Sequence, residues 1–255
     1  EGDGLLGQNN TTSYSSPVQV GSDTTWNTGD LKIATNKFAS GAIKTDGTLW
    51  TWGANPYGAL GQNQQHSSAT GDKSSSPAQV GSATTWANIH FSNGGAIATK
   101  TDGTLWSWGY QSTSGALGTN DRTNRSSPVQ VPGTNWDTGE GKISVGQRSR
   151  FGIRTDGTLW AWGNNNEGQL GINLTNPGGL RSSPVQVGSG TDWNTVLGNA
   201  GYWTVAGKTD GTLWAWGGNG NGRLAQNTPG NTNYSSPTQI PGTNWQGRTE
   251  SDRYD

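Results

Sequence analysis

Four aspartates recur in one nonapeptide, and a carboxylate repeated in this way could serve as a general acid or as a metal ligand. They are Asp46, Asp102, Asp156 and Asp210, each within a Thr-Asp-Gly-Thr-Leu-Trp-x-Trp-Gly stretch. Each aspartate also precedes a glycine between two apolar runs, where turn chemistry by itself favours aspartate. We therefore interpret the four aspartates as turn residues rather than as acids or ligands.

Two histidines and scattered serines are the other residues whose chemistry could support catalysis. His66 and His90 lie in different repeats, and their spacing fits neither a metal-ligand pair nor a nucleophile–base pair. The chain has no cysteine and no Gly-x-Ser-x-Gly motif, and its glycine-rich stretch 217–220 lacks the lysine of a phosphate-binding loop. We therefore expect a protein that is not an enzyme and that uses no metal and no cofactor.

The nonapeptide itself reads as a hairpin followed by a strand. An Asp-Gly pair between two strands predicts a two-residue type I′ turn, in which both central residues have positive φ. After the turn, Leu49 falls on one face of the strand and two tryptophans fall on the other, as expected where both faces pack against neighbouring sheets. Besides the four aspartates, the residues assigned to this turn and core are Gly47, Trp50, Trp52, Gly103, Trp106, Trp108, Gly157, Trp160, Trp162, Gly211, Trp214 and Trp216.

The nonapeptide belongs to a longer repeat with a period of about 54 residues. Its copies start at residues 45, 101, 155 and 209, and two further signatures, Gly-x-Leu-Gly and Ser-Ser-Pro, keep the same spacing. A period of this length predicts a propeller or a solenoid, whose units bury their faces against their neighbours.

We expect an all-β propeller of four-stranded antiparallel blades. In the first unit the proline-led segment 17–20 is predicted at the outer edge of a sheet, because proline cannot donate to a ladder, and strands near Ile33, 42–44 and 49–52 follow it. The whole chain 1–255 is predicted to be one array. Its expected units are 15–61, 75–118, 126–171 and 182–225, with partial units at 1–7 and 235–255.

Composition narrows the classes of partner. Only 28% of the residues are hydrophobic, whereas the chain has 42 glycines and 14 tryptophans, a mixture that suits short strands and tight turns. The net charge is −1 with no clustered basic patch, so we expect no nucleic-acid partner. No apolar run is long enough for a membrane span, so we also expect no membrane insertion.

The repeat resembles those of the regulator of chromosome condensation family. The stretch TDGTLWAWGNNNEGQLG at 155–171 fits that pattern best, and the resemblance covers essentially the whole chain. It implies a β-propeller, usually of seven blades, which would need more residues than this chain has. We therefore expect part of a longer polypeptide, and the alternative is a small propeller with a makeshift last blade.

Relatives in this family include a nucleotide exchange factor, inhibitors of β-lactamase, and repeats of bacterial surface and phage structural proteins. The low charge and the loops rich in Asn, Thr, Gly and Ser resemble the last group, so we expect a structural, adhesive or protein-interaction module, extracellular or virion-associated. One alternative is a soluble regulator that binds a protein as an inhibitor or exchange factor. Another is a lectin that uses Trp203, Tyr110 and Tyr202.

A binding face follows from the meander, because alternate connections leave opposite ends of a sheet. The Asp-Gly turns share one end, whereas the connections at the other end differ in length and sequence. We predict that a protein or glycan, or further copies or repeats of the chain, bind at that variable end. The candidate contacts are Lys37, His66, Lys73, Arg122, Arg125, Arg148, Arg150, Arg181 and Tyr202.

Overall fold

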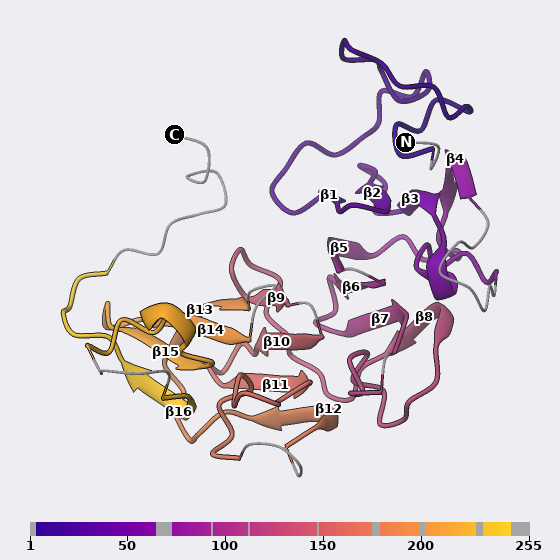
Figure 1. Cartoon of the computed structure of the whole chain (residues 1–255). Helices are drawn as coiled ribbons and strands as arrows, with labels where there is room; N and C mark the ends of the chain where they lie inside the picture. The colour runs from indigo at the N-terminus through magenta and orange to yellow at the C-terminus, as the bar shows by residue number, and fades with distance from the viewer. Residues whose placement is uncertain are drawn as a thin grey trace. The chain divides into compact units, whose positions relative to one another are not determined.

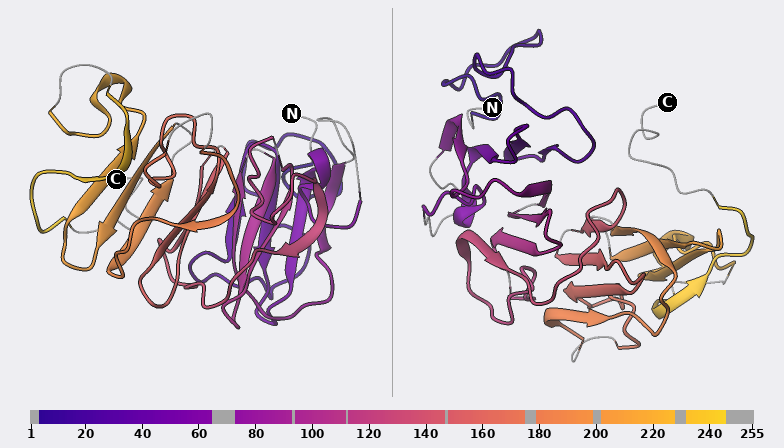
Figure 2. Two further views of the ribbon diagram at one scale, coloured as in Figure 1. Left: turned by 90° about the horizontal axis from the view of Figure 1, so that it is seen from below. Right: turned by 180° about the vertical axis from the view of Figure 1, so that it is seen from behind.

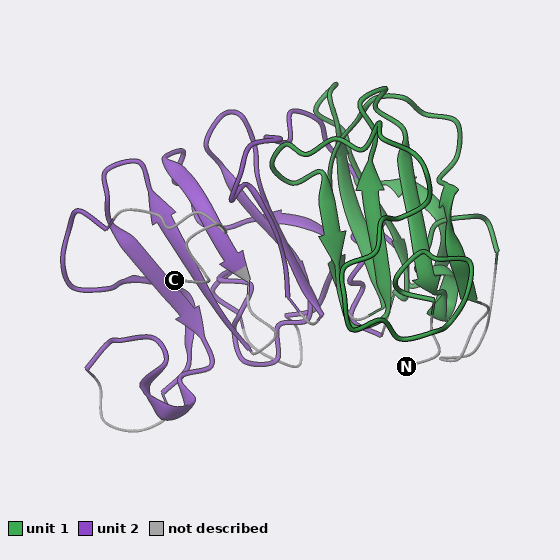
Figure 3. Ribbon diagram, turned by 90° about the horizontal axis from the view of Figure 1, so that it is seen from above, with its two compact units in different colours: residues 1–112, 122–131 green, residues 113–121, 132–255 purple. Residues whose placement is uncertain are grey.

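The computed structural model is all-β and contains four separate four-stranded antiparallel sheets, as predicted (Figure 1). It describes residues 4–64, 73–92, 94–111, 113–146, 148–174, 179–198, 202–227 and 232–245. Within these ranges the helical segments are two short 3-10 turns, η1 (Pro56–Gly58) and η2 (Gly220–Gly222). The chain separates into two compact units, coloured in Figure 3: residues 1–112 with 122–131, and residues 113–121 with 132–255.

The first unit holds two sheets, which we call blade 1 and blade 2. Blade 1 consists of β1 (Ile33–Thr35), β2 (Ala39–Ile43), β3 (Leu49–Ala54) and β4 (Lys73–Gln79). Blade 2 consists of β5 (Trp86–Ser92), β6 (Gly95–Lys100), β7 (Leu105–Gly109) and β8 (Arg125–Gln130). In each blade the strands lie side by side in chain order.

The second unit holds blade 3 and blade 4, with the same order of strands (Figure 2). Blade 3 consists of β9 (Ile143–Val145), β10 (Ser149–Ile153), β11 (Leu159–Gly163) and β12 (Arg181–Gln186). Blade 4 consists of β13 (Trp193–Gly198), β14 (Trp203–Lys208), β15 (Leu213–Gly217) and β16 (Tyr234–Gln239).

The proline-led strand lies at a sheet edge, but it closes a blade instead of opening one. In blade 1 the strand with Pro77 is β4, which pairs with β3 across a register shift between Thr51 and Gly53. The blades therefore begin one strand later than the expected repeat units. Residues 15–20, the first proline-led segment, form no strand. Their counterparts pair with a Leu-Trp strand that precedes them, and the described residues 4–14 contain no such strand.

The Asp-Gly hairpin also differs from the predicted type I′ turn. Gly47 has φ +78°, but none of the four aspartates has positive φ. The Gly47 N–H donates to the Lys44 carbonyl at 2.9 Å, and the Lys44 N–H donates to the Thr48 carbonyl at 2.9 Å. The loop thus has three residues, in which an ordinary turn is followed by one left-handed glycine.

The core of each unit lies between its two blades. In the first unit Ile43, Leu49 and Ile89 are buried together, and in the second unit Phe151, Leu159 and Val196 are. The second tryptophan of the motif is fully buried in blades 2, 3 and 4. The predicted apolar strand faces therefore form the packed surfaces between neighbouring sheets of one unit.

Within each unit, the Gly-x-Leu-Gly element that follows the third strand of the first blade bonds to the second blade. In the first unit the Trp108 indole N–H donates to the Ala59 carbonyl at 2.9 Å, and the Asn63 N–H donates to the Ser126 carbonyl at 2.8 Å. A Cβ on Gly58, which has φ +83°, would lie 2.5 Å from the Ser126 Cα. The glycine is required because the backbone of the outer strand lies directly against it.

Candidate functional site

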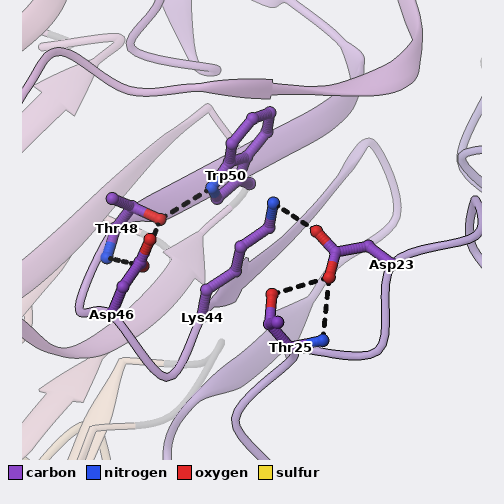
Figure 4. A network of polar contacts seen from close by, with 6 residues as sticks. All are labelled: Asp23, Thr25, Lys44, Asp46, Thr48 and Trp50. Atoms are coloured by element: carbon purple, nitrogen blue, oxygen red, sulfur yellow. Dashed lines mark hydrogen bonds and ion pairs between the residues drawn. The ribbon is translucent and has the colours of Figure 1, made fainter.

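The Asp-Gly end of each blade carries one hydrogen-bonded relay of three side chains (Figure 4). Asp46 Oδ1 accepts from the Thr48 backbone N–H at 2.9 Å and from the Thr48 hydroxyl at 2.7 Å. The same hydroxyl oxygen accepts from the Trp50 indole N–H at 2.9 Å. Corresponding bonds join the other three turn aspartates to the threonine and the tryptophan that follow them.

These hydrogen bonds determine the ionisation of the turn aspartates. The threonine hydroxyl, and then the threonine backbone N–H, hold the pKa of Asp46 below its usual value of 3.8. The pKa values of the other three aspartates are lowered by the same two donors. An ionised carboxylate engaged in this way shapes a turn and is poorly suited to act as an acid at neutral pH.

A basic side chain lies between two indole rings beside each turn, a feature that we did not predict. In blade 1 the Lys44 Nζ is 3.8 Å from the ring centroid of Trp50 and 5.1 Å from that of Trp26. It also forms an ion pair with Asp23 at 2.5 Å, drawn in Figure 4. The equivalent cations in blades 2, 3 and 4 are Lys100, Arg154 and Lys208. A usable sequence signal existed, since each nonapeptide is directly preceded by Lys or Arg.

The hairpin tips are covered by the backbone of the following repeat. The Trp86 N–H donates to the Gly47 carbonyl at 3.1 Å, and the Trp193 N–H donates to the Gly157 carbonyl at 3.1 Å. A Cβ on Gly157 would lie 2.0 Å from the Thr191 carbonyl oxygen. The Asp-Gly end therefore serves to join consecutive repeats.

At the opposite end, which we call the loop end, two series of connections meet in every blade. The Ala54 N–H donates to the Phe38 carbonyl at 2.7 Å, and the Asn164 N–H donates to the Arg148 carbonyl at 2.9 Å. Equivalent bonds join Tyr110 to Gly94 and Gly218 to Tyr202. The connection before the second strand of a blade thus lies beside the connection after the third, as the meander predicted.

The predicted contact residues differ in their exposure. Those that are exposed are Lys37, Lys73, Arg122, Arg148 and Tyr202. Arg125 and Arg181 are half-buried at the first positions of β8 and β12, and the Arg181 guanidinium donates to the Leu180 carbonyl at 2.9 Å. His66 lies outside the described residues.

Arg150 is not an exposed contact residue, contrary to our expectation. Its side chain is 3% exposed, and its guanidinium donates to the carbonyls of Gly146 at 3.0 Å and Ser149 at 3.1 Å. Burial lowers the pKa of Arg150 to about 10. The prediction was wrong because Arg150 belongs to β10, where alternate side chains enter the interior, whereas the sequence suggested a loop.

The aromatic residues considered for a lectin site are partly covered. Trp203 is half-buried, and the Arg223 guanidinium lies 4.7 Å from its ring centroid. Tyr110 packs against Tyr57 with ring centroids 4.5 Å apart. Tyr202 is 48% exposed and is the most open of the three candidate aromatic residues.

Two further classes of site are absent from the residues that the structure describes. No group of three or more histidine, cysteine, aspartate or glutamate side chains there could hold a metal ion. In the same ranges, no helix has the length and apolar character needed to cross a membrane.

Known proteins are similar to this chain over most of its length. The mitochondrial RCC1 domain-containing protein RUG3 of Arabidopsis thaliana is 28% identical over 201 residues, covering 77% of this chain and 43% of that protein. The ultraviolet-B receptor UVR8 of the same plant is 28% identical over 202 residues, covering 75% and 42%. The chain spans under half the length of these relatives.

Solved structures show the same fold. Yeast RCC1 (Prp20), in a crystal structure bound to Kap60, matches 83% of this chain and 48% of its own with a TM-score of 0.67 at 18% identity. Human WBSCR16 matches 82% of this chain and 52% of its own with a TM-score of 0.63 at 18% identity.

Sequence models of a single repeat decide the family. One model of the regulator of chromosome condensation (RCC1) repeat matches residues 46–95, 102–138 and 156–199, and a second model of that repeat matches residues 142–169. Because these matches cover more than half of the chain, the protein belongs to the regulator of chromosome condensation (RCC1) repeat family.

Proposed function

We propose that this protein is a non-enzymatic interaction module that binds a protein partner through the loop end of its blades. The difference between the two ends of the blades is the observation that supports this proposal. Hydrogen bonds that recur from repeat to repeat occupy the Asp-Gly end, whereas Lys37, Arg148 and Tyr202 are exposed at the loop end. Variable connections on a rigid sheet scaffold are a common location for binding residues.

Related proteins support a protein partner. Yeast Prp20 has been crystallised with Kap60, and a separate study of Prp20 concerned its binding to Gsp1p and histones. The low net charge and the Asn-, Thr- and Ser-rich loops of this chain favour a different setting, a structural or adhesive role in a cell-surface or virion-associated assembly. For this chain we therefore propose a protein partner and a structural or adhesive setting.

The test compares two pairs of substitutions in the same two blades. A partner captured on the immobilised chain is identified by mass spectrometry, and its affinity is then measured by calorimetry. Arg148→Ala with Tyr202→Ala, at the loop end of blades 3 and 4, should weaken binding by about 1–3 kcal/mol because arginine and tyrosine often anchor interfaces.

The control pair is Thr155→Ala with Thr209→Ala, two exposed residues at the Asp-Gly end of the same blades. This pair should leave the affinity nearly unchanged, and thermal melts should show that both double variants are folded. A loss of affinity in the control pair but not in the loop-end pair would refute the proposed face.

A further inference from the structure

A cavity of about 350 Å³ lies on the flank of blade 3, within the second unit. Arg154 and Trp160 of that blade line it, together with Ser183 and Pro184 of the outer strand β12. Two connecting segments complete it with Asn120 and with the pair Pro132 and Gly133. Its lining contains none of the residues proposed for binding at the loop end, so nothing in the proposed function makes use of it.

Arg154 is the cation that lies between two indoles in this blade, 3.9 Å from the ring centroid of Trp160 and 4.9 Å from that of Trp136. The equivalent lysines of blades 1 and 4 have acidic partners, since Lys44 pairs with Asp23 and Lys208 with Asp192. Within the described ranges the Arg154 guanidinium has no ion pair, and its buried Nε–H has no hydrogen-bond acceptor. A buried N–H without an acceptor is costly, so an acceptor from a ligand would stabilise it.

Two further side chains that line the cavity, those of Asn120 and Ser183, lack a hydrogen bond that the equivalent side chains of the other repeats form with each other. In the other three repeats an asparagine side chain accepts a hydrogen bond from a serine of the outer strand: Asn9 from Ser76 at 3.1 Å, Asn63 from Ser127 at 3.1 Å, and Asn173 from Ser236 at 3.2 Å. The corresponding pair in blade 3, Asn120 and Ser183, does not form this bond in the part of the chain that the structure describes. Both side chains line the cavity instead.

The segment before blade 3 is adapted to the guanidinium. The stretch 131–136 is one residue shorter between its valine and its tryptophan than the stretches 20–26, 80–86 and 187–193. Gly133 has φ +106°, and a Cβ there would lie 2.3 Å from the Arg154 Nη2. Only a glycine at this position leaves room for the arginine, which is longer than the lysines of the other blades.

These groups match one kind of ligand. A guanidinium, a hydroxyl and a carboxamide supply several hydrogen-bond donors around one positive charge, and guanidinium binds a carboxylate through two parallel bonds. The nearby Asp156 interacts electrostatically with Arg154, which disfavours a dianion such as phosphate more strongly than a monoanion. The proline and indole surfaces suit the apolar part of a peptide.

We propose that the blade 3 cavity binds a peptide carboxylate, held by Arg154 through two hydrogen bonds and by Ser183 and Asn120 through one each. The carboxylate can come from an acidic side chain or from a chain terminus. Both sources present the same group to the guanidinium, and the experiment below separates them.

The experiment titrates the full 15N-labelled chain and follows the Arg154 Nε–H and Trp160 indole N–H resonances by NMR. The probes are acetyl-Gly-Glu-Gly-amide, acetyl-Gly-Gly with a free carboxyl end, acetyl-Gly-Gln-Gly-amide and inorganic phosphate. Saturable shifts with the glutamate peptide or the free carboxyl end, and none with the glutamine peptide, are expected, and the tighter of the first two probes identifies the source. Equal shifts with the glutamine peptide, tighter binding of phosphate, or no saturation with either carboxylate would overturn the proposal.

Variants of the cavity residues, with a control variant in blade 2, test whether Arg154 and Ser183 hold the carboxylate. Arg154→Lys keeps the charge and installs the residue of the other three blades, and it should weaken binding about tenfold or more because lysine cannot make the paired bonds. Lys100→Ala, which removes the equivalent cation of blade 2, should leave the affinity unchanged. Ser183→Ala should weaken binding while the melting temperature stays close to that of the wild type. Unchanged affinity in Arg154→Lys would refute the role of the guanidinium.

Discussion

The two ends of the blades differ in how much of their structure repeats. At the Asp-Gly end every blade has the same aspartate–threonine–tryptophan relay, and the backbone of the following repeat covers the hairpin tips of blades 1 and 3. At the loop end a backbone hydrogen bond between two connections recurs, and in blades 1, 3 and 4 an asparagine side chain accepts from a leucine N–H, while the exposed side chains around these bonds differ. The Asp-Gly end therefore repeats nearly unchanged, whereas the loop end combines the recurring contacts of the Gly-x-Leu-Gly elements with exposed side chains that vary.

This difference teaches that a repeated motif need not mark a site of function. The conspicuous residues of the nonapeptide satisfy one another: the carboxylate bonds to the threonine, the threonine bonds to the indole, and the indole packs on a cation. The features that could recognise a partner occur where the repeat is broken, as at Arg154, which replaces a lysine. Substitutions at the two ends should accordingly have different consequences.

The largest effect is expected where the Asp-Gly tip meets the next repeat. Gly157→Ala places a Cβ 2.0 Å from the Thr191 carbonyl oxygen on a backbone with φ +77°, so it should lower the free energy of unfolding by about 3 kcal/mol or more. The control is Gly188→Ala in the same unit, where φ is +61° and no atom lies within 4 Å. It should cost about 1 kcal/mol from backbone strain alone. Equal costs in urea unfolding would show that the tip is not tightly docked.

A second comparison uses two arginines that are two residues apart near the loop end. Arg150→Ala should destabilise the protein by about 2 kcal/mol, because it removes a buried side chain that donates to two carbonyls. Arg148→Ala, at an exposed loop position, should change stability by less than about 0.5 kcal/mol. Thermal and urea unfolding of both variants measure the difference. Similar values would mean that Arg150 is as solvent-accessible as the sequence suggested.

The third comparison concerns pH and sets the titration of a histidine inside a strand against that of the turn aspartates. Burial lowers the pKa of His90, in the strand β5, from 6.5 to about 4, so between these values the unfolded chain binds a proton that the native state does not. Stability should therefore fall by about 2–3 kcal/mol as the pH decreases from 6.5 to 4, since one pKa unit corresponds to about 1.4 kcal/mol. The turn aspartates have native pKa values below 3.8, so their contribution is present above that pH and is lost only at lower pH.

His90→Gln tests this separation. The variant should lose the pH dependence between 6.5 and 4 and keep the loss of stability at lower pH, as measured by urea unfolding at a series of pH values. A wild-type curve that is flat between pH 7 and 4 would contradict the neutral state of His90 in the folded protein.

Much of the fold was determined by the sequence because the signals are local and are repeated four times. Proline excludes a strand from the middle of a sheet, and Leu49 alternates with Trp50 and Trp52 on a strand buried on both faces. These rules do not depend on distant residues, so the strands, the meander and the meeting of connections at the loop end could be predicted. Lys37 and Arg148 were predicted to lie in connections between strands, and both are exposed there.

Tertiary structure alone decided which strand completes a blade, which charges are buried and which polar groups lack partners. Residues 15–20 and 182–187 have the same sequence, yet only the latter segment contains a strand, because a neighbouring Leu-Trp strand must supply its hydrogen bonds. Arg150 is buried although it was predicted as a contact residue, and Arg154, for which we predicted no role, lines a cavity. Burial and hydrogen-bond partners come from residues distant in sequence, such as Asn120 and Gly133 around Arg154, and no local pattern records that proximity.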